Sequence, residues 1–342
     1  MNMNYMMEKE ITEQSDIIGS LIEKYIVDNK INYSIDTEFC DIVLVASGSS
    51  YNAAVVSKHF FENISKIKVS VEYASEFAFK EVQFSPKTLY IFISQSGKSA
   101  DTLKAFKKAK NKGAKTLCIT NNLDSPMHKD ADYNFYINAG MEYAIAATKT
   151  FSASVCALWI IALSFSQNIE NEIVEAKDFS KNLADLKIEN IDLAADEISK
   201  LNGFSILGCE QNFALAKEAA LKIKETSYIA ASAYPMGEFV HGHFAILNKL
   251  NSILIFMDKN SKKREYELLE KIKKTYQTKT IIVSDNEINA DILVKIPSYN
   301  SRFMTILAQI ITLQTLAFKV ATALNYDVDK PLGLNKVVED RK

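Results

Sequence analysis

The stretch IFISQSGKSADTLKAF, residues 91–106, contains the features that decide the fold. An apolar run leads into a turn of small hydroxyl residues around one glycine, and a helical pattern follows. The first N–H groups of a helix, together with its dipole, favour an anion. The hydroxyls of Ser94, Ser96 and Ser99 and the amide of Gln95 add donors, so the turn predicts a phosphate site. A helix simply capped by a serine-rich turn is the alternative.

Strands and helices alternate around this stretch. Apolar runs predict strands at 41–48, 68–74, 88–94 and 114–120, and periodic patterns predict helices at 5–30, 49–64, 99–113 and 148–167. Ser49 and Ser50 are the candidates for the N-cap of the helix at 49–64. Strands that are apolar throughout and separated by helices imply a parallel sheet covered on both faces.

The second half of the chain repeats this plan at an offset of about 160 residues. The matching pairs of segments are DIVLVASGSS with GFSILGCEQN, VEYASEF with SAYPMGEF, TLYIFIS with SILIFMD, and AKTLCITN with TKTIIVSD. A polar stretch, 166–187, separates the halves and predicts a helical connector. The fold class is therefore α/β, with two tandem doubly wound parallel-sheet units of the flavodoxin-like kind, an N-terminal helix and a C-terminal tail.

Composition excludes several classes of function. The chain has 342 residues and a formal net charge of -2, which argues against a nucleic-acid partner. The longest apolar run, around Val155–Phe165, is too short for a membrane span, and the N-terminus lacks the pattern of a signal peptide. The four cysteines are widely spaced, as in a reduced compartment, so we expect a cytoplasmic protein.

A second hydroxyl-rich loop, SGSS at 47–50, ends another predicted strand. Ligands of doubly wound sheets bind beyond the carboxyl ends of the strands, so two such loops can converge on one phosphate. The loops match neither GxGxxG nor GxxxxGK[ST], which argues against a dinucleotide or nucleoside triphosphate. The corresponding stretch of the second half, MDKNSK, lacks the hydroxyl cluster. We therefore expect one phosphate monoester per chain, held without a metal, at a junction between the units.

The segment 217–243 carries the remaining candidates for chemistry. Glu218, Lys222 and Glu225 recur at helical spacing and share one face, either as a solvated ion-pair stripe or as a catalytic group. His241 and His243 have the spacing of a metal pair, but no third ligand accompanies them, so we expect no metal.

Six ordered motifs carry a resemblance to a known family: ASGSSYNA, VEYASEF, ISQSGKSADTL, ATKTF, KEAALKIKETSYIAASAYPMGEFVHG and DVDKPLGLNK. Together they look like the isomerase portion of the glucosamine-6-phosphate synthases, which consists of two sugar isomerase (SIS) domains. The resemblance implies an N-terminal helical segment at 1–35, SIS domains at 36–170 and 196–325, a connector at 171–195 and a lid tail at 326–342. The N-terminal cysteine nucleophile of a glutaminase is missing, so we expect no glutaminase activity.

The resemblance also implies roles for individual residues. Glu225 moves a proton between C1 and C2 of an open-chain sugar, His241 opens the ring, and Lys336 forms a Schiff base with the ketose. The catalytic set also includes Lys222. No cofactor is implied, and a homodimer completes the site across its interface. The residues implied in binding sugar and phosphate are Ser49, Ser50, Ser94, Gln95, Ser96, Ser99, Glu142 and Ala146.

Several features depart from the family or remain open. Ala147 and Ala230 stand where synthases often have Ser and His, and His243 stands where proline is usual, as a structural substitution or a change in the pocket wall. In the tail, Leu332 and Leu334 are apolar enough to fold back onto the body.

Three functions follow in order of preference. The first is an isomerase and deaminase that converts glucosamine 6-phosphate to fructose 6-phosphate and ammonia. The second is a deglycase of fructosamine 6-phosphates. The third is a phosphosugar-binding regulator without catalysis, which the short stretch before the first strand disfavours because a DNA-binding domain usually needs more residues.

Overall fold

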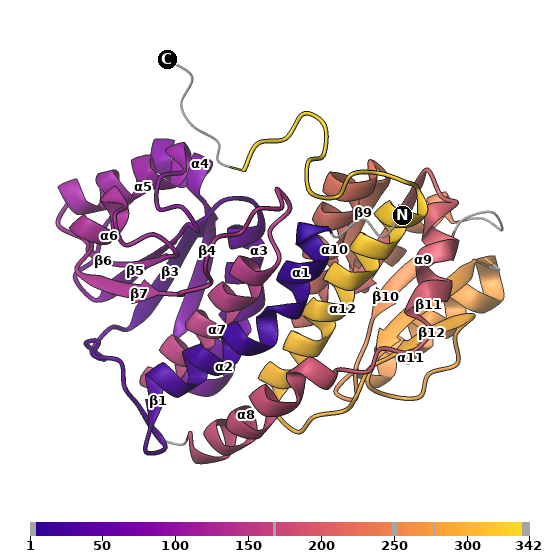
Figure 1. Ribbon diagram of the computed structural model, residues 1–342, viewed down its shortest axis with the longest axis horizontal. Coiled ribbons are helices and arrows are strands. Elements are labelled where there is room, and N and C mark those ends of the chain that lie inside the picture. The colour runs from indigo at the N-terminus through magenta and orange to yellow at the C-terminus, as the bar shows by residue number, and fades with distance from the viewer. Residues whose placement is uncertain (1–4, 167–168, 248–251, 277, 337–342) are drawn as a thin grey trace. The chain divides into compact units, whose positions relative to one another are not determined.

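The computed structural model describes residues 5–166, 169–247, 252–276 and 278–336 (Figure 1). Its described residues fall into two compact units, each built on a five-stranded sheet. We call residues 13–142, 147–181 and 335–336 the N-terminal unit, and residues 5–12, 143–146 and 182–334 the C-terminal unit. The domain boundaries given above stay a prediction.

The elements of the N-terminal unit alternate as the sequence predicts. Its strands are β1 (Ile26–Val27), β2 (Lys30–Ile31), β3 (Asp41–Ala46), β4 (Lys68–Tyr73), β5 (Thr88–Ile93), β6 (Lys115–Thr120) and β7 (Tyr133–Tyr136). Its helices are α2 (Gln14–Tyr25), α3 (Gly48–Phe60), α4 (Ala74–Phe79), α5 (Ala100–Asn111), α6 (Pro126–Asp130), α7 (Lys149–Ser164) and α8 (Glu170–Asn182).

The C-terminal unit has the same kinds of element. Its strands are β8 (Gly203–Gly208), β9 (Ala230–Pro235), β10 (Ser252–Phe256), β11 (Lys279–Ser284) and β12 (Ile292–Lys295). Its helices are α1 (Met6–Thr12), α9 (Ile191–Ser199), α10 (Gln211–Ser227), α11 (Lys263–Lys271) and α12 (Arg302–Ala323), with short helical turns at Leu183–Asp185, Glu238–Val240 and His243–Ile246.

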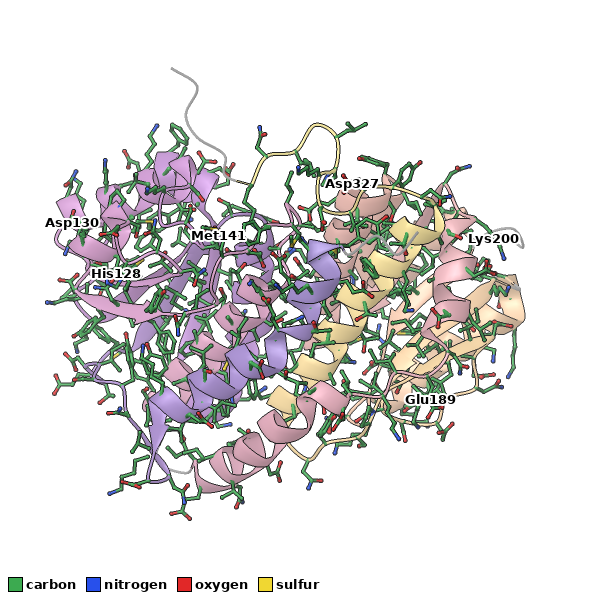
Figure 2. The ribbon with its side chains drawn as sticks, in the orientation of Figure 1. His128, Asp130, Met141, Glu189, Lys200 and Asp327 are labelled. Atoms are coloured by element: carbon green, nitrogen blue, oxygen red, sulfur yellow. The ribbon has the colours of Figure 1, made fainter. Side chains whose placement is uncertain are left out.

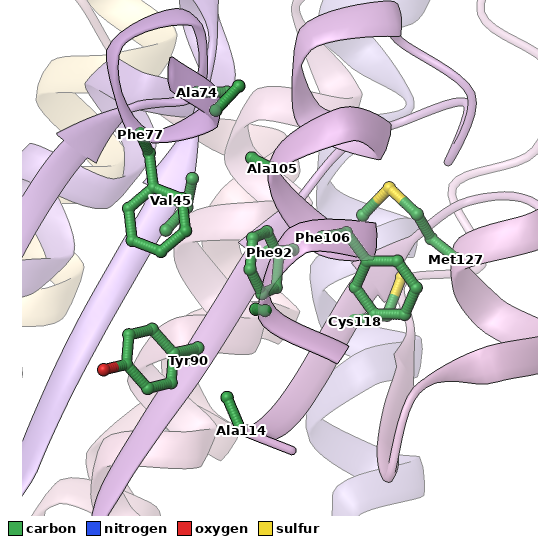
Figure 3. Close-up of a cluster of buried hydrophobic side chains, with 12 residues drawn as sticks. Val45, Ala74, Phe77, Tyr90, Phe92, Ala105, Phe106, Ala114, Cys118 and Met127 are labelled. Carbon is green, nitrogen blue, oxygen red and sulfur yellow. The ribbon is translucent and has the colours of Figure 1, made fainter. Parts of the chain in front are cut away.

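The main sheet of the N-terminal unit is wholly parallel, with strand order β4-β3-β5-β6-β7. Side chains of a strand alternate between its faces, so each apolar strand feeds two cores. One face is covered by α4 and α5. There Phe77, Phe92 and Phe106 interlock as edge-to-face rings, with Met127 beside them (Figure 3). Burying each such ring contributes about 1.5–3 kcal/mol to stability. Helices α3 and α7 cover the other face of the sheet.

The C-terminal unit repeats this architecture, which confirms the duplication read from the sequence. Its sheet is parallel with order β9-β8-β10-β11-β12, the same as that of the N-terminal unit when corresponding strands are aligned. Helices α10, α12 and α9 pack together on one face, and α11 contributes Leu269 to the core on the other.

A Thr–Asp clasp between the last two strands recurs in both units. In the N-terminal unit, the Thr116 backbone N–H and hydroxyl donate to one Asp132 carboxylate oxygen at 2.9 and 2.7 Å. In the C-terminal unit, Thr280 donates in the same way to Asp291 at 2.7 and 2.8 Å. Burial acts to raise the pKa of Asp132, but the bonds from Thr116 and Lys110 hold it below the ordinary value. The clasp fixes the strand that closes each sheet edge.

The prediction of a single helix over residues 5–30 is wrong. Helix α1 ends at Thr12, α2 ends at Tyr25, and a short hairpin of β1 and β2 follows. Asp28 and Asn29 take positive φ angles of 50° and 56°, a conformation that Asn and Asp tolerate in turns. Apolar periodicity alone could not show this hairpin, because the two strands are short.

The assignment of Ser49 or Ser50 as N-cap is also wrong. Ser47 is the N-cap of α3, with extended φ and ψ of -129° and 154°, and both expected residues lie in the first turn.

One helix meets the length and hydropathy of a membrane span, contrary to the sequence expectation that none would. This helix is α12, and 83% of its most apolar window is buried inside the protein, as in the central helix of a globular unit. The expectation failed because the four threonines and two glutamines of α12 interrupt the apolar run without lowering its mean hydropathy enough.

The repeated clasp predicts paired losses of stability. Asp132→Ala and Asp291→Ala should each lower the free energy of unfolding by about 1–3 kcal/mol, because each leaves two donors of a threonine without their acceptor. Urea unfolding measures this loss. Asp124→Ala is the matched control, since its carboxylate is 91% exposed and pairs with Lys129 at the surface, and it should change stability by less than about 0.5 kcal/mol. Equal losses in all three variants would contradict the role of the clasp.

Candidate active site

The serine loop at the end of β5 is organised by its own hydroxyls. Ser94 is buried, and its Oγ accepts from the Gly97 N–H at 3.1 Å and lies 3.2 Å from the Ser99 Oγ. The Ser96 Oγ accepts from the Lys98 N–H at 3.2 Å. Ser99 is the N-cap of α5, yet its side chain does not cap the first turn. The loop therefore presents a preformed turn at the start of a helix, as the sequence predicts.

Gly97 is required at the centre of this loop. Its φ is +62°, and a Cβ built on it would lie 2.2 Å from the Oγ and 2.4 Å from the Cβ of Ser125. Ser125 is fully buried and caps α6 through the His128 N–H. Glycine thus lets the loop lie directly against α6.

The second hydroxyl loop joins β3 to α3 at the same edge of the sheet. Gly48 has a φ of +57°, and Ser49 and Ser50 follow it, both half-buried in the first turn of α3. Since β3 and β5 are parallel neighbours, both hydroxyl loops emerge from their carboxyl ends. The N-terminal unit thus brings its predicted phosphate residues to one edge.

Glu142 and Lys336, both in the N-terminal unit, form an ion pair. Glu142 is fully buried there, and its Oε1 accepts from the Thr148 and Thr150 N–H groups at 3.0 and 3.1 Å, while its Oε2 accepts from the Thr150 hydroxyl at 2.7 Å. Burial acts to raise the pKa of Glu142, but the Lys336 charge and these hydrogen bonds hold it below its ordinary value. Imine formation by Lys336 would require its amine to leave Glu142.

The tail that precedes Lys336 is held by polar contacts rather than by its leucines. Leu332 and Leu334 are 83% and 38% exposed, so the expectation that they fold back onto the body is wrong. The anchors are the fully buried Val328 and the backbone N–H of Leu332, which donates to the Tyr228 hydroxyl at 2.7 Å. The leucines fail to pack because a turn beginning at Asp327, labelled in Figure 2, directs the backbone through hydrogen bonds instead.

Asp329 ties the tail to the start of the chain within the C-terminal unit. Its two carboxylate oxygens accept from the Met6 and Met7 N–H groups of α1, both at 2.8 Å. Its backbone carbonyl accepts from Ile145 at 3.1 Å, next to the buried Ala146. A carboxylate at a helix N-terminus satisfies donors that have no partner within the helix.

Lys222 lies between two carboxylates on one face of α10. It is fully buried, ion-paired with Glu225 and 3.5 Å from the Glu218 Oε1. Glu218 is also fully buried, whereas the Glu225 side chain is 22% exposed. The solvated ion-pair stripe considered above is thereby excluded, because solvated stripes do not bury a lysine completely. A buried cation instead fixes one carboxylate that solvent can reach.

Glu225 does not lie at the carboxyl edge of the sheet, where its position in the sequence led us to expect it. We expected α10 to lie at the ligand end because it follows β8 directly, but only its start does. Helix α10 runs back along the sheet to β9, so Glu225, near its end, lies toward the amino edge. The role of Glu225 therefore does not follow from the carboxyl-edge rule for doubly wound sheets.

The two neighbouring histidines differ in environment. His241 is exposed after the turn Glu238–Val240, whereas the His243 ring stacks 5.8 Å from Phe239 and lies 4.2 Å from Tyr234. Over the residues that the structure describes, no group of three His, Cys, Asp or Glu side chains could hold a metal ion.

Comparison with known proteins shows the family to which the chain belongs. The sequence model of the SIS domain matches residues 40–164 and 197–318, once in each half. The chain belongs to the SIS domain family. It is 32% identical, over 346 residues, to glutamine–fructose-6-phosphate aminotransferase (isomerizing) of Aquifex aeolicus, covering 98% of this chain and 57% of that protein. The chain thus spans somewhat more than half the length of the curated relatives it matches.

Solved structures show the same SIS fold. The C-terminal domain of glucosamine-fructose-6-phosphate aminotransferase from Francisella tularensis has a TM-score of 0.88 at 28% identity, covering 96% of this chain and 99% of that one. A glucosamine-6-phosphate deaminase from Thermotoga maritima has a TM-score of 0.78 at 23% identity, covering 98% and 99%, which shows likeness of fold alone.

Some partners that hold the candidate site residues in place were not predicted from the sequence. Thr148 and Thr150, which donate hydrogen bonds to Glu142, lie in the quoted motif ATKTF. The motif was recognised in the sequence, but these bonds to Glu142 were not predicted. Glu218 was placed on the helical face but left out of the catalytic set, because spacing alone does not show that Lys222 is buried.

The serine loop predicts a strong dependence on Gly97. Gly97→Ala should lower the free energy of unfolding by about 2–4 kcal/mol, through positive-φ strain plus overpacking against Ser125. Gly113→Ala is the matched control, because Gly113 has a φ of +73° but open space around its Cβ position, and it should cost about 1 kcal/mol. Urea unfolding compares the two. Equal costs would show that close packing against Ser125 does not constrain the loop.

The lowered pKa of Glu142 predicts the pH dependence of its contribution to stability. A depressed folded-state pKa means that the stabilisation is fully present above the ordinary carboxyl pKa and is lost as the pH falls through the lowered value. Glu142→Gln should therefore be less stable than the wild type at pH 7 by about 1.5–3 kcal/mol, and the difference should shrink below about pH 4. Urea midpoints from pH 7 to pH 3 measure it.

Glu287→Gln controls for the charge change, since Glu287 is 84% exposed in its pair with Lys295. A difference between wild type and Glu142→Gln that stays constant down to pH 3 would contradict an ionised, stabilising Glu142.

Proposed function

We propose that the chain is a phosphosugar isomerase that converts glucosamine 6-phosphate and water into fructose 6-phosphate and ammonia. Membership of the SIS family and similarity to isomerizing aminotransferases over 98% of the chain support this function. The observation that carries it is the fully buried Lys222, which holds the solvent-accessible carboxylate of Glu225 in place. The nitrogen product of the proposed reaction is free ammonia.

The phosphate is assigned to the two hydroxyl loops of the N-terminal unit. Backbone N–H groups at the starts of α3 and α5 supply charge-complementary donors, and a dianion gains from both helix dipoles. Hydroxyls and one amide complete a cradle without a metal. The residues assigned to it are Ser49, Ser50, Ser94, Gln95, Ser96 and Ser99; among them Ser94, which is buried, acts mainly by shaping the loop.

Proton transfer is assigned to Glu225. After His241 opens the ring by moving a proton between the ring oxygen and O1, Glu225 removes the proton from C2 and returns it to C1. In the same step a proton passes from the C2 amine to O1, so the aldose with a C2 amine becomes a ketimine at C2. Lys222 keeps the carboxylate in one position throughout, because it is fully buried and cannot turn away. A general base positioned in this way contributes about 10²–10⁴-fold.

Lys336 completes the reaction. Its amine adds to C2 of the ketimine and expels ammonia, and water then hydrolyses the new imine to the ketose and restores the amine. Glu142 holds the amine when no sugar is bound, and the proton that Lys336 loses for the attack leaves with the expelled ammonia as ammonium. Glu142 and Ala146 belong to this part of the proposed site.

The remaining assignments concern assembly and location. We propose a homodimer in the cytoplasm, in which each chain supplies His241 to its partner. The exposure of His241 on the single chain supports this role, because a residue that serves a second copy has to lie on the surface.

The purified chain should release ammonia from glucosamine 6-phosphate, measured by coupled reduction with glutamate dehydrogenase. Glu225→Gln should lower kcat/KM by about 10²–10⁴-fold, because it removes the base and keeps the shape. Glu267→Gln is the matched control in the same unit, as its carboxylate is 62% exposed and, among the described residues, forms an ion pair with Lys263 alone. It should leave the rate unchanged.

The same assay separates the competing functions. Release of an amino acid from fructosamine 6-phosphates without ammonia from glucosamine 6-phosphate would replace deamination by deglycation. Tight binding of both sugars without turnover would indicate a regulator. Equal rates for Glu225→Gln and the control would remove Glu225 from the mechanism.

A further inference from the structure

The carboxyl edge of the C-terminal sheet is closed by buried charged side chains. The loop Met257–Lys262 joins β10 to α11 there, as Ser94–Ser99 joins β5 to α5 in the N-terminal unit. Asp258 in this loop is 1% exposed and forms an ion pair with Arg302, the first residue of α12. Burial acts to raise the pKa of Asp258, but the charge of Arg302 holds it below the ordinary value. The carboxylate is therefore an anion.

Donors converge on this carboxylate from the loop Met257–Lys262 and from the starts of α10 and α12. Its Oδ1 accepts from the Asn260 N–H at 2.7 Å, and its Oδ2 accepts from the Asn212 amide at 2.7 Å. Arg302 donates to it through Nη1 and uses its Nε to bond the Gln211 Oε1 at 2.9 Å. A backbone N–H, an amide and a guanidinium are the donors that a phosphate attracts.

The donors occupy the positions that hydroxyls occupy in the N-terminal unit. Glu210 has a φ of 51°, where the other unit has Gly48 at 57°. Gln211 and Asn212 follow Glu210 as Ser49 and Ser50 follow Gly48. In the C-terminal unit these two side chains are buried and face the Asp258–Arg302 pair.

A second carboxylate satisfies the start of α11. Glu265 accepts from the Lys262 N–H at 2.8 Å and from the Ser261 hydroxyl at 3.0 Å. In α5 the side chain of Ser99, at the equivalent N-cap, makes no such bond. Two negative side chains thus stand where an incoming phosphate would have to bind, and they repel it.

We propose that Asp258 is a built-in anion that fills the ligand position of the C-terminal unit. It restricts the chain to phosphate binding at the other unit, and removing it opens a latent site for phosphate. Arg302, Asn212 and the Asn260 N–H would then face an empty position with an unbalanced positive charge. This role of Asp258 is one of specificity, because Asp258 decides how many phosphates a chain accepts.

Equilibrium dialysis with inorganic phosphate at constant ionic strength tests this role. Asp258→Ser should bind one more phosphate per chain than the wild type, and Asp258→Ser combined with Arg302→Leu should lose that gain. Asp291→Ser is the matched control: it removes one negative charge from the same unit, along with the clasp to Thr280, but faces no guanidinium. It should bind as many phosphates as the wild type.

The difference in bound phosphate between Asp258→Ser and the wild type tests the proposal, and the total number bound does not. A wild-type chain that binds no phosphate would contradict the proposed function, yet Asp258→Ser would still gain one site. If Asp258→Ser does not fold by itself, it is refolded with added phosphate, and its Tm should rise more with phosphate than that of the wild type. An unchanged number of bound phosphates, or an unchanged Tm response, would overturn the role of Asp258.

Discussion

Burial of both faces of a parallel sheet is the constraint on which this chain depends. When helices cover both faces, only the two edges at the strand ends are left for polar chemistry. In each unit the carboxyl edge collects the starts of helices, where N–H groups lack partners within the helix. An anion is well suited to satisfy them. The N-terminal unit leaves that position to small hydroxyl loops, and the C-terminal unit fills it with Asp258.

The strands and the duplication could be predicted from the sequence because buried parallel strands are apolar throughout and therefore easily recognised. The hydroxyl loops were equally visible, since Gly97 and its serines stand directly after β5. The break after Thr12 and the hairpin at Asp28 were not, because turn conformation depends on single residues rather than on periodicity. The clustering of Glu218, Lys222 and Glu225 followed from helical spacing, but the burial that makes it informative did not.

Burial decides how these charged groups are to be interpreted. A lysine on a solvated helix face contributes little, because water screens its pairs. Lys222 has no such screening, and removing a buried charge from water costs several kcal/mol unless its partners compensate. In return for this cost, the position of the Glu225 carboxylate is fixed before a substrate arrives. Glu142 illustrates the same principle, since the Lys336 charge, two backbone N–H groups and the Thr150 hydroxyl hold it ionised although it is fully buried.

The contacts of Asp258 in the C-terminal unit also explain why an apolar residue is unsuitable at position 258. An apolar side chain at Asp258 would remove the acceptor of the Asn260 N–H, of the Asn212 amide and of the Arg302 Nη1. Each unsatisfied buried donor costs about 1–3 kcal/mol, and a charged donor costs more. A carboxylate satisfies all three at once, since its two oxygens offer about four acceptor positions. The donors at this edge of the C-terminal unit are therefore satisfied by an anion that the chain itself supplies.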